Sequence, residues 1–590
     1  MTDPRPAVPV LALMVGALIL ASALRAQGGG EATDPQDFWD DLESFAEEIA
    51  VEVVDLQVRV VDRKGRPVTG LTRDDFTLYV DGEPVEVDYF DAVGFGDGQG
   101  DDASVSGPAA DSPAEAAPSG PPRRWVVIFL DQIHLTTTGR KQLVRDMERF
   151  LRETLDPEVP VMVATSAGGL QMVQGFTLDR GRVLQVLAEE ERADPGGIHE
   201  RVARASAVRE IRSIYDANEG CNLDRPGGDP SVSDPCDCAL DQMISTVRIR
   251  AAQVTGKVED SLSALDTLVS ALRGLPGSKT VLVASDGLEL IPGLDLYRFV
   301  MDLCPQYEAE LSTYAQEGTD LLPVYQGVTA HAAASRVTFY SLETAGLQAD
   351  GGVTAVRGTR LSERARIANL QQSLYVLADE TGGDAVLNAN RFEDELVEIA
   401  EDMDAYYSLG FTPDHPGADR VHQIYVDVEG KHHDVRYRQR YRHASTDGRI
   451  ADRMLGALLF GVEQNPLNVL TEVAERAAAE ADGDSDERAV AVRIRLPLKH
   501  LTLNPEEGGA AGLVRLFLSV QKAAGDWQPV RHRRVPLRLL EGESEASAVR
   551  FVEVELELEP GEYLLALGVR DELGGDVSYL RETFGVQGRN

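Results

Sequence analysis

The feature that most constrains the fold of this chain is an alternation of apolar runs with amphipathic segments between residues 123 and 413. The run Trp125–Leu130 (WVVIFL) has no polar position, which is typical of a central strand covered on both faces. The next segment, residues 139–155, repeats apolar side chains at helical spacing. Further strands are predicted at residues 159–165, 280–284, 337–341 and 385–387, and further helices at 254–272, 361–379 and 392–404. Such alternation predicts parallel pairing and a three-layer, doubly wound α/β domain.

Two aspartates directly follow predicted strands of this domain. Asp131 comes after WVVIFL, and Asp286 comes after TVLVAS. Ligands of doubly wound folds bind at the carboxyl ends of the strands, at the point where the strand order reverses. Two carboxylates at this edge favour a hard divalent cation. The alternative is a structural role, because aspartate commonly caps the helix or turn that follows a strand.

Several segments resemble one known family. WVVIFLDQIHL, PGSKTVLVASDGLEL and YYSLGFTP occur in this order after the block VVDRKGRPVTGLTRDDFTLYVDG. Together they resemble the VWFA-related acidobacterial domain family, from about residue 51 to residue 441. These are secreted bacterial proteins with a central unit similar to a von Willebrand factor type A domain. The resemblance implies a vWA/Rossmann-like α/β fold and a role in protein–protein or surface adhesion.

The same resemblance implies a degenerate metal-ion-dependent adhesion site. Type A domains use the motif D-x-S-x-S after the first strand, together with a distant threonine and a later aspartate. Asp131 matches the first aspartate and Asp286 the last, but Ile133 and Leu135 stand where the serines are expected. Thr136 could supply a hydroxyl by a different loop path. The candidate metal ligands are therefore Asp131, Asp286 and Thr136, with Mg²⁺ or Ca²⁺ as the expected ion if any cofactor is bound.

A hydrolase is a less favoured alternative. His134 lies three residues after Asp131, and Ser285 adjoins Asp286. The sequence contains no G-x-S-x-G, H-E-x-x-H or P-loop pattern that would support catalysis. His134 is therefore expected to pack or cap its loop, and the chain is not expected to be an enzyme.

The four cysteines are an even number, as expected in an oxidising compartment. They are Cys221, Cys236, Cys238 and Cys304, and the first three bracket a Gly/Pro/Asp-rich stretch in an expected insertion at residues 191–253. One or two disulfides are predicted, and the pairing stays open because four cysteines allow three connectivities. A zinc site is less favoured, since C-x-C is not the usual C-x2-C spacing and no histidine is near.

The amino terminus predicts export. The apolar run Val10–Ala23 ends in small residues and is shorter than the ~20 residues of a spanning helix. Residues 1–26 are therefore interpreted as a signal peptide, with an uncleaved anchor as the alternative because the basic region before the run is weak. The expected location is secreted or periplasmic, with no integral membrane segment after cleavage.

The charge balance excludes one class of partner. The chain has 57 Lys plus Arg and 98 Asp plus Glu, a net charge of −41, which repels nucleic acid. The sign of this surface is expected to change at residues 433–442, a predicted strand that carries arginines at alternate positions on one face. These are Arg436, Arg438, Arg440 and Arg442. They predict either a solvated face paired with carboxylates or a contact site for an anionic glycan or an acidic partner.

Composition divides the rest of the chain into further modules. Residues 51–93 alternate in the manner of strands, and residues 94–122 have the composition of a flexible linker. Residues 420–443 read as a β-hairpin, and we hypothesise that they form one β-sandwich with residues 51–93, into which the α/β domain is inserted. Residues 447–480 are predicted to be a helical connector, and residues 487–587 a carboxy-terminal sandwich of immunoglobulin-like size.

The segment Tyr406–Phe411 is expected to close the large sheet of the α/β domain. The function predicted from all these features is an exported binding or scaffold protein with a protein or cell-surface ligand. The alternative is a metal-independent structural scaffold of the cell envelope.

Overall fold

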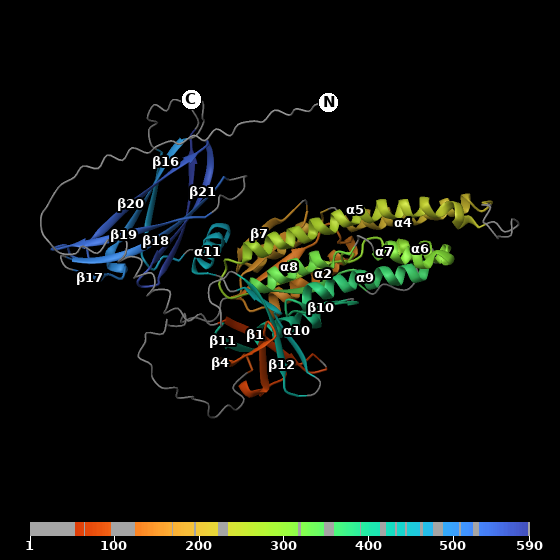
Figure 1. Ribbon diagram of the computed structural model, residues 1–590, viewed down its shortest axis with the longest axis horizontal. Helices are drawn as coiled ribbons and strands as arrows, with labels where there is room; N and C mark the ends of the chain where they lie inside the picture. The colour runs from red at the N-terminus through yellow and green to blue at the C-terminus, as the bar shows by residue number, and fades with distance from the viewer. Residues whose placement is uncertain are drawn as a thin grey trace, which may run out of the picture. The chain divides into compact units, whose positions relative to one another are not determined.

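The computed structural model of this 590-residue chain is a mixed α/β structure with several sheets (Figure 1). It describes residues 54–95 and 124–587, apart from 64, 168, 194–195, 222–233, 317–319, 347–358, 390, 414–419, 431–432, 443–444, 461–463, 476–487, 507–508 and 523–529. The predicted signal peptide and all but the first two residues of the predicted linker lie outside these residues. Within the described part, no helix combines the length and apolarity needed to cross a membrane.

The central sheet has six strands in the order β10-β9-β8-β5-β6-β7. All neighbours pair in parallel except β6 and β7, which are antiparallel. The strands are β5 (Arg124–Leu130), β6 (Val161–Thr165), β7 (Gln171–Thr177), β8 (Ser278–Ser285), β9 (Val337–Glu343) and β10 (Ala385–Val386). The chain order runs outward in opposite directions from β5 and β8, so the switch point of the sheet lies between these two strands.

Helices cover both faces of this sheet, which explains why β5 is apolar at every position after its first residue. Val127 and Phe129 point into a core shared with three helices, α5 (Pro235–Leu272), α8 (Leu322–Ala334) and α9 (Thr359–Asp379). Ile128 and Leu130 point into the opposite core, formed with α2 (Thr137–Arg149), the π-helical turn η2 (Phe150–Thr154), α3 (Arg180–Glu190) and α10 (Glu393–Asp404). Successive side chains of a strand face opposite ways, so a strand between two helical layers buries both sets.

The predicted insertion is a helical extension of this domain. It consists of α4 (Gly196–Ala217) and the first half of α5, which pack on α6 (Leu294–Leu303) and α7 (Glu308–Gln316). A short helix, η3 (Pro305–Tyr307), joins the last two. The pairing left open by the sequence is Cys221–Cys238 and Cys236–Cys304. The second bond ties α5 to Cys304, the residue that directly follows α6.

The segments on either side of the α/β domain form two four-stranded sheets around one core. The sheets are β13-β1-β11-β4 and β14-β12-β2-β3. Their strands are β1 (Val54–Val61), β2 (Phe76–Val80), β3 (Glu83–Val85), β4 (Tyr89–Val93), β11 (Tyr406–Phe411), β12 (Val421–Val428), β13 (Asp434–Tyr437) and β14 (Arg440–Arg442), with a short helix η1 (Arg73–Asp75) before β2. Residues 54–93 and 421–442 thus share one β-sandwich, into which the α/β domain is inserted.

The expectation that Tyr406–Phe411 closes the large sheet was wrong. This strand, β11, pairs with β1 and β4 in the amino-terminal sandwich. Tyr407, Leu409 and Phe411 are buried in the sandwich core. A buried strand after a helix reads the same in either sheet, because the periodicity does not show which neighbours cover it.

The carboxy-terminal module is a second β-sandwich with its own core. It contains β15 (Leu470–Glu475), β16 (Arg488–Pro497), β17 (Asn504–Glu506), β18 (Gly509–Lys522), β19 (Arg531–Leu540), β20 (Val549–Leu558), β21 (Gly561–Asp571) and β22 (Val577–Val586), with a short helix η4 (Leu498–His500). One sheet has the order β15-β16-β20, and in the other β18 lies between β19 and β21.

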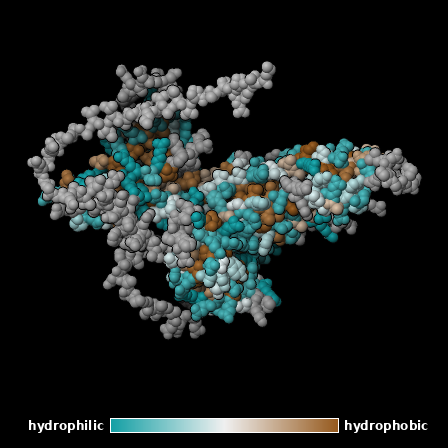
Figure 2. Space-filling model, in the orientation of Figure 1, coloured by the Kyte–Doolittle hydropathy of each residue, from teal (hydrophilic) through white to brown (hydrophobic). Residues whose placement is uncertain are grey.

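On the face shown in Figure 2, hydrophilic and hydrophobic residues are mixed over the molecule.

The predicted helical connector at 447–480 was wrong in its second half. The helix α11 (Thr446–Phe460) ends at Phe460, and Leu470–Glu475 is the strand β15, which pairs with β16. Ile450 and Met454 of α11 pack against Phe517 and Tyr579 of the carboxy-terminal sandwich. The apolar residues Leu470, Val473 and Ala474 have helical spacing, and pairing with the neighbouring strand β16 overrides this local pattern.

Candidate functional site

Asp131 lies at the switch point, directly after β5, and is only 1% exposed. Its carboxylate has four hydrogen-bond partners. Ser166 and Ser261 donate to Oδ1 at 3.0 and 2.9 Å, and Ser285 and Nδ1 of His134 contact Oδ2, both at 2.8 Å. A carboxylate offers about four acceptor positions. The side chains around Asp131 therefore fill all of its acceptor positions.

Three secondary-structure elements besides β5 bring these partners together. Ser166 follows β6, Ser285 is the last residue of β8, and Ser261 lies within α5. Parallel strands end at the same edge of a sheet, so Ser166 and Ser285 flank Asp131 on both sides. Ser261 comes from the helix that covers this edge.

This network keeps Asp131 charged. Burial raises the pKa of a carboxyl group, but the attraction of His134 and the hydrogen bonds of His134, Ser285 and Ser261 outweigh burial, so the pKa of Asp131 is lowered. The carboxylate is thus ionised at neutral pH inside a fully buried site.

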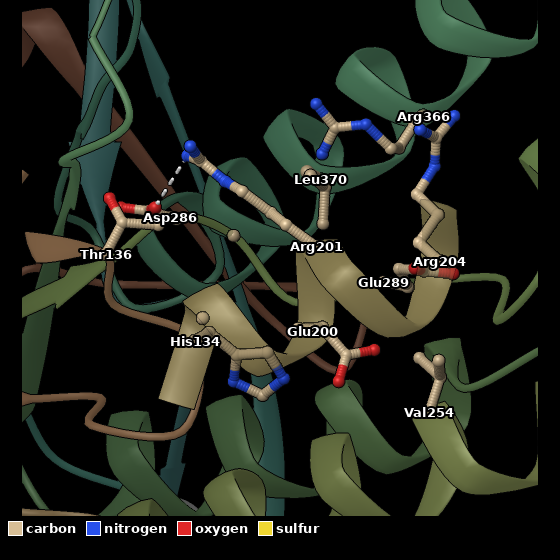
Figure 3. A pocket seen from close by; sticks show the side chains of 12 residues that line it. His134, Thr136, Glu200, Arg201, Arg204, Val254, Asp286, Glu289, Arg366 and Leu370 are labelled. Carbon is tan, nitrogen blue, oxygen red and sulfur yellow. Dashed lines mark hydrogen bonds and ion pairs between the residues drawn. The ribbon is translucent and has the colours of Figure 1, made fainter. Parts of the chain in front are cut away.

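Asp286 has a separate set of partners. Thr344, just after β9, donates to Oδ1, and Nη2 of Arg201 lies 3.3 Å from Oδ2. Thr136 also hydrogen-bonds to this carboxylate. Burial raises the pKa of Asp286, and the two threonines and Arg201 offset this only in part. Figure 3 shows Thr136 beside Asp286 with Arg201 reaching toward them, while the His134 ring lies apart.

The predicted metal ligands lie at one edge of the sheet, and the charge of Asp131 acts on Asp286, but the two aspartates have different hydrogen-bond partners. Thr136 and Asp286 are hydrogen-bonded, whereas Asp131 is held by serines and His134. Among the described residues, no group of three or more His, Cys, Asp or Glu side chains is arranged to hold a metal ion.

The helix α4 of the insertion covers the rim of the sheet. The backbone N–H groups of Gly196 and Gly197 donate to the carbonyls of Gln132 and Leu135 at 3.0 and 3.1 Å. A Cβ atom at Gly197 would lie 2.4 Å from the carbonyl oxygen of His134, so only glycine allows this approach. The close contact places the next turn of α4 over the strand ends.

A small cavity of about 60 Å³ remains between α4 and the strand ends. Its lining is rich in charged side chains from α4, the loop after β8 and α9. The lining residues are His134, Thr136, Gly197, Glu200, Arg201, Arg204, Val254, Asp286, Gly287, Glu289, Arg366 and Leu370. This volume has room for a few water molecules or one small polar group.

The arginines of the cavity differ in how firmly they are held. Arg204 pairs with Asp295 at 2.5 Å and with Glu363 at 2.9 Å, and Arg366 also pairs with Glu363, at 2.7 Å. The Arg201 side chain is 60% exposed and contacts Asp286 only at 3.3 Å. Arg201 is therefore the cation of this cavity that is best placed to reach an outside ligand.

Glu289 is a carboxyl group of the cavity whose pKa is strongly raised. Its Oε2 accepts a hydrogen bond from the N–H of Gly293 at 2.7 Å. Burial and the neighbouring charge of Asp295 raise the pKa of Glu289 to about 7. The charge of this cavity therefore changes near neutral pH.

The four arginines do not share one strand, and the predicted alternative of pairing with carboxylates is found at Arg436 and Arg442. Arg436 lies on β13 and Arg440 and Arg442 on β14, and the two strands belong to different sheets. Arg436 pairs with Asp384 at 2.9 Å, and Arg442 pairs with Asp452 at 2.6 Å.

Arg438 lies between the two strands. Its guanidinium donates to the carbonyl of Asp55 at 2.6 Å, and burial lowers its pKa to about 9. The chain leaves the extended conformation between β13 and β14. The four arginines therefore do not alternate along one continuous strand, as the prediction of a basic face required.

Sequence reasoning missed Ser166, Ser261, Thr344 and Arg201. Ser166 and Thr344 stand just after strands, as Asp131 does, so their positions carried a signal. Arg201 lies inside α4 and Ser261 inside the second half of α5, and these positions within long helices carried none. Only packing brings them to the rim.

No protein family model matches this chain, and no curated protein matches it. Among solved structures, it is similar to the conserved hypothetical protein BatB from Bacteroides thetaiotaomicron, with 12% identity over 48% of this chain and 97% of that one, at a TM-score of 0.22. An aerotolerance-related membrane protein from Bacteroides fragilis has 12% identity over the same shares, at a TM-score of 0.23. A β-glucuronidase from Bacteroides uniformis has 9% identity over 20% of this chain and 13% of that one, at 0.14.

Proposed function

We propose that this chain is an exported binding or scaffold protein whose von Willebrand factor type A-like domain recognises a protein or surface ligand without a metal ion. The observation that carries this proposal is the saturation of the Asp131 carboxylate by four protein donors. In the metal-dependent sites that the sequence resembles, an ion joins the loops at the strand ends. Here serine hydroxyls and His134 join the same loops through Asp131.

The donor set does not fit Mg²⁺ or Ca²⁺. Both ions take six or more oxygen ligands, mostly carboxylates, carbonyls and water. An ion at Asp131 would displace hydrogen bonds in a site that is 1% exposed. An ion at Asp286 would meet the positive charge of Arg201, 3.3 Å from the carboxylate. A degenerate Mg²⁺ or Ca²⁺ site at Asp131, Asp286 and Thr136 is the alternative that a titration separates.

A hydrolytic role is disfavoured by the same geometry. Ser261 Oγ lies 3.4 Å from Nδ1 of His134, but it donates to Asp131 at 2.9 Å, and Asp131 contacts the same nitrogen. A nucleophilic serine needs its base on a ring nitrogen that the aspartate does not occupy. Ser261 is also fully buried. The arrangement supports a binding role over a catalytic one.

The flanking modules support a scaffold. Two β-sandwiches accompany the α/β domain, and we propose that the carboxy-terminal one is immunoglobulin-like. The cavity under α4 gives the rim a charged contact surface in which Arg201 is the accessible cation. A partner of this rim would be an unidentified protein or a component of the cell surface.

Calorimetric titration tests the metal-free proposal. Mg²⁺, Ca²⁺ and Mn²⁺ are titrated into the chelator-treated full chain, the variant Asp131→Asn and the control Asp260→Asn, an exposed aspartate of α5. We expect only heats of dilution with all three proteins, because protein donors occupy the acceptor positions of Asp131. Saturable heat in the wild type and the control that disappears in Asp131→Asn would overturn the proposal in favour of the degenerate metal site.

A further inference from the structure

The strand β19 carries the basic run RHRR at residues 531–534 on a chain of net charge −41. All four side chains of this run are exposed. Among the described residues, no carboxylate lies in ion-pair contact with Arg531 or Arg533. Arg531 and Arg533 are therefore accessible cations, unlike the arginines of residues 436–442.

The same strand lies at the edge of its sheet. It pairs with β18 along its whole length, from Leu518↔Arg531 to Gly509↔Leu540, and no other described strand pairs with it. Figure 1 shows β18 and β19 side by side in the blue carboxy-terminal module. An edge strand leaves a row of backbone N–H and C=O groups without a neighbouring strand.

Part of this edge is closed. Pro536 has no backbone N–H to donate. In an edge strand, the nitrogen of a proline faces away from the neighbouring strand. Two residues on, the outward carbonyl of Arg538 accepts from Nε and Nη2 of Arg550, at 3.0 and 2.5 Å. Backbone groups of alternate residues point to the same edge. The side chain of Arg550 and Pro536 therefore block the second half of β19, and the open part coincides with the basic run.

We propose that residues 530–534 of β19 bind an extended acidic peptide, which adds to the sheet as a further strand. Alternate residues of a strand are about 6.7 Å apart, so Arg531 and Arg533 match carboxylates at alternate positions of an extended peptide. A second copy of β19 would place arginine against arginine, which is unfavourable. The charge therefore selects an acidic strand and rejects self-association. This site is separate from the rim of the α/β domain.

Fluorescence anisotropy with a labelled peptide of alternating glutamate and valine tests the charge requirement on the full chain. We expect the double variant Arg531→Glu/Arg533→Glu to bind at least about tenfold more weakly than the wild type, because opposed carboxylates repel. The control is Arg581→Glu, an exposed arginine of β22 in the same sheet, which we expect to stay within about twofold of the wild type. Equal binding by the double variant and the wild type would overturn the proposal.

Two further probes test the strand geometry and the folding of the variant. A peptide N-methylated at alternate residues keeps its charges but loses backbone donors, and we expect it to bind much more weakly. A lysine–valine peptide should bind the double variant and not the wild type, which also shows that the variant is folded. Two outcomes would refute strand addition, because each would show that the surface recognises charge alone. One is undiminished binding of the methylated peptide, and the other is binding of anionic phosphatidylglycerol vesicles as tight as that of the glutamate–valine peptide.

Discussion

Two arginine-rich runs of this chain have similar sequences and opposite environments. The run at residues 433–442 is HDVRYRQRYR, and the run at residues 531–538 is RHRRVPLR. In the first run, Arg436 pairs with three carboxylates, those of Asp384, Asp402 and Asp434. In the second run, residues 531–534 are exposed.

The difference shows that neighbouring elements decide the role of a charged run. Arg436 lies on β13, within reach of Asp402 of α10, so its charge is used inside the structure. Arg531 and Arg533 lie on an edge strand beside β18, and among the described residues no carboxylate pairs with either of them. The first run is therefore structural, and the second is available to a partner.

The largest expected effect is the loss of a buried pair in the first run. The Arg436 side chain is 19% exposed, and Asp402 is 6% exposed. Replacing Arg436 by alanine leaves Asp402 buried with less compensation, so we expect Arg436→Ala to lower the free energy of unfolding by about 3 kcal/mol. Calorimetric unfolding of the full chain measures this loss.

The matched control for this prediction is Arg440→Ala, a half-buried arginine of the same run. Arg440→Ala should lower the free energy of unfolding much less than Arg436→Ala does. Equal effects of the two substitutions would show that the run acts as a general charge and not through its specific partners, which would break the comparison.

A second prediction extends the comparison to a carboxyl group. Burial raises the pKa of Glu289 from 4.5 to about 7, so the folded state binds more protons than the unfolded state between these values. Stability must therefore fall as the pH rises through this window, by up to about 3 kcal/mol. We expect Glu289→Gln to remove this dependence and to be more stable than the wild type at pH 8, a value about one unit above the folded pKa.

Unfolding temperatures measured across this pH window check the prediction. Glu259→Gln, at an exposed position of α5, serves as the control and should follow the wild type. An unchanged pH profile in Glu289→Gln would mean that the Glu289 carboxyl is solvated in the folded chain.

The smallest effect is expected in the second run. Arg533 is exposed and has no ion-pair contact among the described residues, so Arg533→Ala should change the free energy of unfolding by no more than about 0.5 kcal/mol. The same calorimetric measurement tests it. A loss comparable to that of Arg436→Ala would show that the second run is also structural.

Much of the α/β domain could be predicted from the sequence. The apolar run Trp125–Leu130 and the helical spacing after it are local patterns, and they led to the sheet and to Asp131 at its edge. Asp286 was found for the same reason. The sheet in which Tyr406–Phe411 pairs could not be predicted, because a buried strand has the same hydrophobic pattern in a sandwich and in a doubly wound sheet.

The chemistry of the rim depended on residues far apart in the sequence. Ser261 lies 130 residues from Asp131, and Thr344 lies 58 residues from Asp286. In the D-x-S-x-S motif of type A domains, the serine positions fall on Ile133 and Leu135 of this chain, which have no hydroxyl group. The hydroxyls that contact Asp131 come instead from β8, from α5 and from the residue after β6.

By itself, the sequence determined where strands and helices form and which residues stand at strand ends. Periodicity and apolar runs are properties of neighbouring residues, so they can be read without knowledge of the fold. Only the tertiary structure decided which charges are neutralised and which hydroxyls surround Asp131. Those partners are selected by packing between distant elements, and a local pattern contains no information about which element will lie beside it.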